Sequence, residues 1–142
     1  MAAKKPAESL GFDIFSHFAT DPKKEAEGVW KEIAPGARVC VARFDNRAFQ
    51  DALAKGYEER RVELDKGGET AEAVAAEVMA DAMAEHLVKG FSGLAYKGKP
   101  QEYSPQAARE MLGHKEFLRL VRRLAEDVEN FRYDAEESAA KN

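Results

Sequence analysis

Chemically reactive side chains are few in this sequence, which has one cysteine, Cys40, and three histidines, His17, His86 and His114. No two histidines have the i, i+4 spacing with which a helix presents a zinc site. Cys40 lies in a valine-rich segment with no base beside it, which favours a small buried hydrophobe over a catalytic thiolate. The 26 aspartates and glutamates contain no pair marked out for acid–base work, and phosphate-loop, nucleophile-elbow and calcium-loop motifs are absent. The sequence therefore predicts no catalytic residue, metal site or cofactor, with an active site assembled from distant residues as the open alternative.

The composition bounds the class of protein. The 142 residues, 44% hydrophobic and 34% charged, suffice for one globular domain with its own core. The formal net charge of −4 disfavours a chain whose main task is to neutralise phosphates, so no nucleic-acid partner is predicted. No apolar run approaches the roughly 18 residues of a membrane-spanning helix, and the first residues lack the apolar centre of a signal peptide. We therefore expect a cytoplasmic protein without a membrane partner.

Residues 1–26 are predicted to form a polar arm with one apolar patch, in which Phe12, Phe15 and Phe18 are spaced at threes. Residues 21–27 are charged and contain Pro22, so we interpret this stretch as a linker. Two fates are open for the three rings. They cover the following hairpin if the arm folds back, and otherwise form a patch that binds another chain.

A β-hairpin is predicted from residues 29–33 and 38–44, which are rich in β-branched and aromatic side chains. Pro35 and Gly36 stand between them, where a turn favours a fixed φ followed by a positive φ. We interpret Trp30 as the core anchor of this hairpin. An exposed anchor for a partner is the alternative, because interfaces are enriched in tryptophan.

Two long helices are predicted next. The first is capped by Asp45 or Asn46 and runs to about Arg61, and the second starts at a Thr70 cap and ends near Gly90. The second helix has an apolar face that can adapt to varied partner side chains, made of Ala75, Met79, Ala82, Met83 and Leu87. Burial of that face in the core is the competing interpretation. Its acidic face carries Glu77, Asp81 and Glu85 and is interpreted as solvated surface, with contact to a basic partner as the alternative.

The rest of the chain predicts a short hairpin around residues 97–99, a helix from Ser104 to Gly113 and a last helix over about residues 115–133. The arginines of that last helix are interpreted as solvated, because acids interrupt them; they are Arg119, Arg122 and Arg123. Residues 134–142 read as a frayed acidic tail. The expected fold is a single, mostly α-helical α+β domain over residues 27–133, with an N-terminal β-hairpin packed on about four helices.

Several stretches, in order along the chain, resemble one protein family. They are residues 19–33, residues 37–44 with the helix after them, residues 79–94, the turn at Tyr103-Ser104-Pro105 and residues 124–131. Over about residues 13–133, the chain is similar to the tail assembly chaperones of long-tailed (siphovirus-type) bacteriophages. The glycine pair at 67–68 with the alanine-rich helix after it, and the arm before Asp13, depart from this resemblance.

The resemblance implies a non-enzymatic late protein of the infected bacterial cytoplasm that is absent from the mature virion. Such a protein coats the tape measure protein, keeps it soluble and helps recruit tail tube (major tail) subunits. Further implied partners are a frameshift-extended form of the same chain and a second copy of itself. Codons GCA AAA AAC for residues 140–142 would provide a slippery heptamer, which is a hypothesis that the 3′ sequence of the gene checks.

The residues predicted to bind a partner are Phe12, Phe15, Phe18, Trp30, Met79, Met83 and Leu87. Two other functions stay open. A structural tail or neck component would be found in purified particles, and a small regulatory or DNA-binding domain would bind DNA in a salt-sensitive way.

Overall fold

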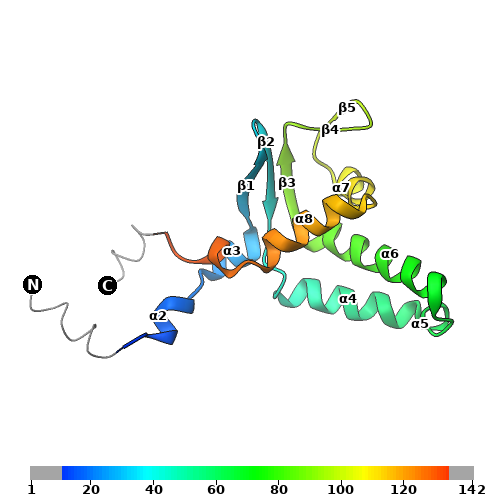
Figure 1. Cartoon of the computed structure of the whole chain (residues 1–142), viewed down its shortest axis with the longest axis horizontal. Helices are drawn as coiled ribbons and strands as arrows, with labels where there is room; N and C mark the ends of the chain where they lie inside the picture. The colour runs from blue at the N-terminus through cyan, green and yellow to red at the C-terminus, as the bar shows by residue number, and fades with distance from the viewer. Residues whose placement is uncertain (1–10, 135–142) are drawn as a thin grey trace, which may run out of the picture.

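The computed structural model describes residues 11–134, so residues 1–10 of the predicted arm and residues 135–142 of the predicted tail lie outside the described residues. The described part is α+β, as predicted (Figure 1). Its elements are α2 (Ile14–Phe18), α3 (Pro22–Glu27), β1 (Val29–Ala34), β2 (Ala37–Val41), α4 (Arg47–Glu59), α5 (Arg61–Leu64), α6 (Gly68–His86), β3 (Val88–Ser92), β4 (Leu94–Tyr96), β5 (Lys99–Gln101), α7 (Pro105–Leu112), α8 (Lys115–Glu126) and the 3₁₀ turn η1 (Val128–Phe131).

Three antiparallel strands form the main sheet in the order β1–β2–β3. The hairpin of β1 and β2 confirms the prediction, with Trp30 opposite Cys40. The third strand is a correction, because α6 ends at His86 rather than near Gly90. Residues 88–92 pair with β2 instead, and this pairing buries Phe91 against the core. Sheet hydrogen bonding therefore ends the helix here.

The second predicted hairpin is confirmed by β4 and β5, which pair on either side of Lys97 and Gly98. Both turn residues have positive φ, 52° and 81°, as a type I′ turn requires.

Two predicted helix caps are confirmed and one is wrong. Asn46 Oδ1 accepts a hydrogen bond from the Phe49 N–H at 2.9 Å, and Ser104 Oγ accepts one from the Ala107 N–H at 3.0 Å. Thr70, in contrast, falls inside the first turn of α6. That helix starts earlier because Gly67, with a φ of 67°, turns the chain directly into it.

Replacing Asn46 with alanine should lower the free energy of unfolding by about 1 kcal/mol, because it removes the acceptor for the Phe49 N–H. Urea unfolding followed by circular dichroism measures the change. The matched control is Arg47→Ala, whose side chain is 94% exposed and lies 3.9 Å from Asp51; it should change stability by less than about 0.5 kcal/mol. Equal losses in the two variants would contradict the cap assignment.

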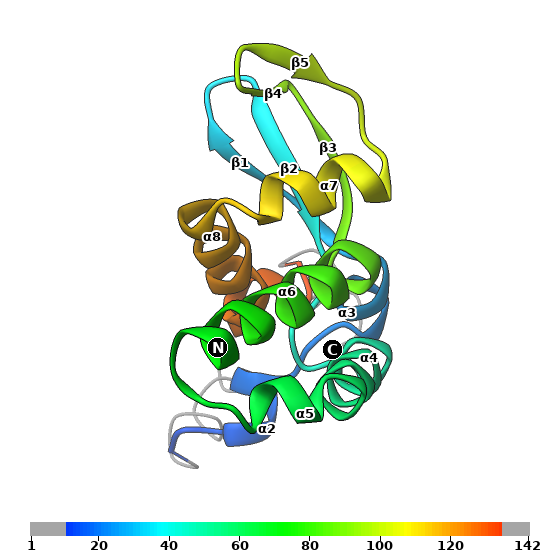
Figure 2. The same ribbon diagram turned by 90° about the vertical axis from the view of Figure 1, so that its right-hand side faces the viewer.

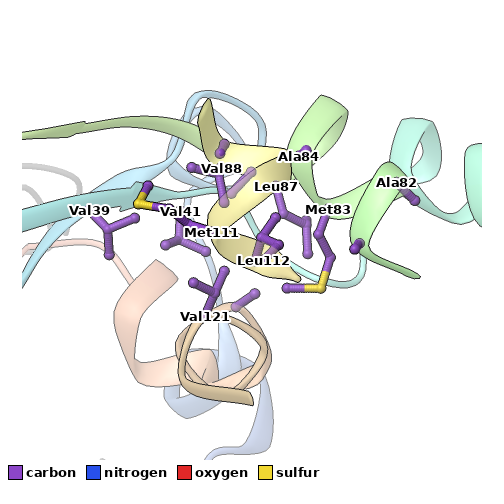
Figure 3. Packing of buried hydrophobic residues seen from close by; sticks show 14 of the residues in the cluster. Val39, Val41, Ala82, Met83, Ala84, Leu87, Val88, Met111, Leu112 and Val121 are labelled. Carbon is purple, nitrogen blue, oxygen red and sulfur yellow. The ribbon is translucent and has the colours of Figure 1, made fainter. Parts of the chain in front are cut away.

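The core lies where the second half of α6 meets the sheet, α7 and α8 (Figure 3). Met83 and Leu87 are 0% exposed there and pack among residues that include Val39, Val41, Val88, Met111, Leu112 and Val121. Both were predicted to bind a partner, so core burial, the competing interpretation, holds for these two residues. The reason is that the second half of α6 packs into the core together with β3, α4 and α7, which leaves little of the apolar surface there free.

The stretch predicted as a linker, residues 21–27, instead forms helix α3, which packs on the folded body. Pro22 is the first residue of α3, where its missing N–H costs nothing. The Asp21 N–H donates to the Phe131 carbonyl at 2.8 Å, and Lys24 Nζ donates to the Arg132 carbonyl at 2.8 Å. Residues 20–27 are therefore tied to the end of the folded body, and α2 projects beyond them (Figure 1).

The last helix is shorter than predicted. α8 ends at Glu126, and Asp127 adopts an extended backbone and accepts a hydrogen bond from the Glu129 N–H at 3.1 Å. An apolar residue predicted beyond Glu126 is still used in the core, because the 3₁₀ turn η1 places the Phe131 ring where it is completely buried.

Candidate helix-binding groove

A groove of about 870 Å³ runs along the outer side of α6, with α7 and α8 forming its other side. Figure 2 shows α7 above α6 and α8 beside them. The apolar residues that line it are Tyr57, Ala73, Ala75, Ala76, Met79, Ala80, Leu112 and Leu118. It is an open surface feature with an apolar floor, large enough for side chains of another polypeptide.

The local sequence explains the hollow. α6 packs on α7, and α7 packs on α8, so α7 stands between the two longer helices. Small alanine side chains on this side of α6 leave space that larger ones would fill, and Met79 supplies a flexible, polarizable contact. Two residues of the predicted apolar face, Ala75 and Met79, therefore line the groove.

The two walls of the groove carry opposite charges. The acids all belong to α6 and are Glu69, Glu72 and Glu77, whereas the bases belong to α7 and α8 and are Arg109, Lys115, Arg119 and Arg122. The sequence prediction missed this arrangement, because it needs the register of α8 beside α6. The spacing of Glu69, Glu72, Ala73 and Ala76 at three and four positions is the signal that could have revealed the α6 side.

Most of the wall charges already have partners within the chain. Glu77 pairs with Arg60 at 3.0 Å, Arg119 pairs with Glu116 at 2.7 Å, and Arg109 pairs with Asp81. Within residues 11–134, no ion pair or hydrogen bond engages the side chains of Glu69, Glu72 or Lys115. These three charges are therefore available to a bound molecule.

The aromatic patch of the arm is exposed. Phe12, Phe15 and Phe18 are 64%, 83% and 50% exposed. Phe12 and Phe18 contact the His17 ring, with centroids 4.7 and 4.8 Å from it, and none of the three rings belongs to the core or to the partly buried residues packed on it. Of the two predicted fates, the structure has the exposed patch and not a cover over the hairpin.

Trp30 is half exposed, at 49%, on the face of the sheet opposite the core. Its ring lies over Gly90, where a Cβ would stand 3.1 Å from Trp30 Cη2, so a larger residue there would require the ring to shift by a few tenths of an ångström. The guanidinium carbon of Arg38 lies 5.2 Å from the ring centroid. Trp30 is thus no core anchor, and the alternative interpretation, an exposed aromatic residue, describes its position.

Cys40 is 5% exposed, and its Sγ lies 3.7 Å from the Glu27 carbonyl. Burial raises the pKa of the Cys40 thiol, against a smaller opposing effect of the positive charge on Lys89. The thiol is therefore protonated at neutral pH and is a poor nucleophile. Among the described residues, no three His, Cys, Asp or Glu side chains are arranged to share a metal ion, and no helix is long and apolar enough to cross a membrane.

The predicted acidic face of α6 is solvated but paired. Glu77 contacts Arg60 between α4 and α5, Asp81 contacts Arg109 of α7, and Glu85 lies 3.7 Å from His86 Nε2. Arg60 holds Glu63 as well as Glu77, which raises the pKa of the guanidinium and lowers the pKa of the Glu63 carboxyl. A second groove, of about 560 Å³, runs along this face between α4 and α6; it is smaller and half of its lining residues are charged, which makes it the weaker candidate.

The part of the chain that contains the groove matches a known protein family. The sequence model of the YdaY prophage protein family matches residues 44–142. The chain belongs to the YdaY prophage protein family. It is therefore a phage-derived protein, and the match includes every residue that lines the larger groove. Phe12, Phe15, Phe18 and Trp30 precede the segment matched to the YdaY family. No curated protein and no solved structure matches the chain.

Proposed function

We propose that this YdaY-family protein is a phage tail assembly chaperone, which binds the tape measure protein without catalysing a reaction and helps recruit tail tube subunits. The observation that carries the proposal is the groove along α6, with its apolar floor and charged walls. Membership of a prophage family and the ordered resemblance to tail assembly chaperones support it. The proposed place of action is the cytoplasm of the infected host, before the mature virion forms.

The groove suits an elongated helical client on physical grounds. Small residues let the backbone of a second helix approach closely, and the client's apolar side chains lose their contact with water against Met79 and Leu118. The charged walls stay at the surface of the complex and keep it dissolved. The exposed rings of Phe12, Phe15 and Phe18 provide a separate apolar contact for a tube subunit or for a second copy of the chain.

Co-expression tests the proposal. The tape measure protein of the same phage is produced alone, with this chain, and with an unrelated acidic protein of similar size. We expect the tape measure protein to precipitate alone and to remain in solution, bound to this chain, only in the second case. Recovery of neither tape measure nor tube protein with the tagged chain from infected cells would overturn the proposal.

Purified virions distinguish the proposal from a structural role. A chaperone should be absent from particles that contain tape measure and tube proteins. Detection of this chain in stoichiometric amounts by mass spectrometry would instead identify a structural tail or neck component.

A further inference from the structure

We infer that the oppositely charged walls of the groove fix the direction in which a client helix lies along α6. This inference rests on the proposed function, because it assumes that the groove receives a helix. It adds a specific client chemistry, which is an apolar stripe with basic residues along one flank and acidic residues along the other.

The shape of the floor favours a helix as the occupant. Its α6 residues recur at three- and four-residue intervals from Glu69 to Ala80, which covers about 17 Å at 1.5 Å per residue. The opposite side is formed by α7 and α8, so a client helix laid along the groove would pack against α6 on one side and against these two helices on the other. Alanines at the contact allow the axis separation of about 8–10 Å at which helices pack.

The charges that remain free supply the directional preference. Glu69 and Glu72 lie on the α6 wall, and Lys115 lies on the opposite wall. A client with its basic flank toward α6 and its acidic flank toward α8 meets opposite charges on both walls. If the client helix is turned end for end with its apolar stripe still on the floor, the flanks exchange sides, and each wall then meets its own charge. From three exposed pairs, we expect about a tenfold preference for one direction at low salt.

Synthetic peptides of about 18 residues test this inference directly. The first peptide has a leucine stripe with lysines on one flank and glutamates on the other, and the second has the two flanks exchanged. A nitroxide is attached through Lys66→Cys, beside the start of α6, in a Cys40→Ala background. Paramagnetic broadening then reports whether the N-terminal or the C-terminal end of a ¹³C-labelled peptide lies near the label.

Four combinations of peptide and protein decide the outcome. We expect the two peptides to lie in opposite directions on the wild-type walls, and each to reverse its direction on the variant Glu69→Lys/Glu72→Lys/Lys115→Glu. Exchanging both flanks and walls should restore the original direction. About 0.5 M salt should abolish the preference but retain binding, because it shortens the screening length to a few ångströms.

Other results overturn the inference in recognisable ways. Binding with equal broadening of both peptide ends would remove the directional preference and leave the proposed chaperone role intact. Binding of the tape measure protein without binding of either peptide would move the client site away from this groove. Concentration-dependent dimerisation that is lost on changing Lys115→Glu would identify a second copy of the chain as the occupant. Failure to bind the tape measure protein, with normal peptide binding, would reject the chaperone proposal alone.

Discussion

Replacing Phe49 with alanine is expected to lower the free energy of unfolding by about 3–5 kcal/mol. Phe49 is completely buried in the first turn of α4, and its ring centroid lies 4.8 Å from that of Phe44. The change would leave a cavity between α4 and the rest of the core, which the alanines of α6 are too small to fill. Urea unfolding followed by circular dichroism and tryptophan fluorescence measures the loss.

The matched control for this prediction is Phe15→Ala, the same substitution on a ring that is 83% exposed and contacts no other aromatic ring among residues 11–134. It should change the free energy of unfolding by less than about 0.5 kcal/mol. A similar loss in both variants would mean that the arm packs on the body, contrary to the structure. If Phe49→Ala is too unstable to purify, Phe49→Leu should show a smaller loss of the same sign.

Replacing Ala76 with tryptophan should weaken binding of the tape measure protein about tenfold or more. Ala76 is exposed on the floor of the groove, so an indole there would occupy the space of a client side chain. The fold should be retained, because the new ring points into open surface and replaces no buried contact. Fluorescence anisotropy with a labelled tape measure segment gives the change in Kd.

The control for the groove substitution is Ala54→Trp, which places the same ring on an exposed position of α4 that lines neither groove. Binding should stay within about twofold of the wild type. If Ala76→Trp binds as tightly as the control, the client does not use the floor of the groove. If only Phe15→Ala weakens binding, the aromatic patch is the client site instead.

The predictions were correct where the type of a single residue determines the local backbone conformation. The Pro35–Gly36 turn, the Asn46 and Ser104 caps and the Lys97–Gly98 turn all lie where predicted, because each depends on a fixed φ, a positive φ or one side-chain acceptor. These features need no knowledge of distant residues.

The predictions were wrong where the local structure depends on a partner far along the chain. Residues 88–92 become a strand only because β2 offers an edge, and α3 docks only because η1 accepts its hydrogen bonds. Met83 and Leu87 could not be separated from Met79 by periodicity, since α6 has neighbours on several sides and its burial follows those neighbours. The groove likewise depends on the register of α8 beside α6.

The pairing of Thr20 with Arg132 has a consequence for local stability. This seam joins segments about 110 positions apart, and it relies on a few hydrogen bonds, on the ion pair Lys24–Asp134, whose Asp134 side chain is exposed, and on the half-buried ion pair Arg43–Glu25. Segments held by so few contacts open readily, whereas the Ala42 amide is held inside the core by the Leu87 carbonyl. Sub-global opening would therefore free the aromatic arm together with α3 while the sheet and the groove stay folded, and hydrogen exchange at Asp21 should be far faster than at Ala42.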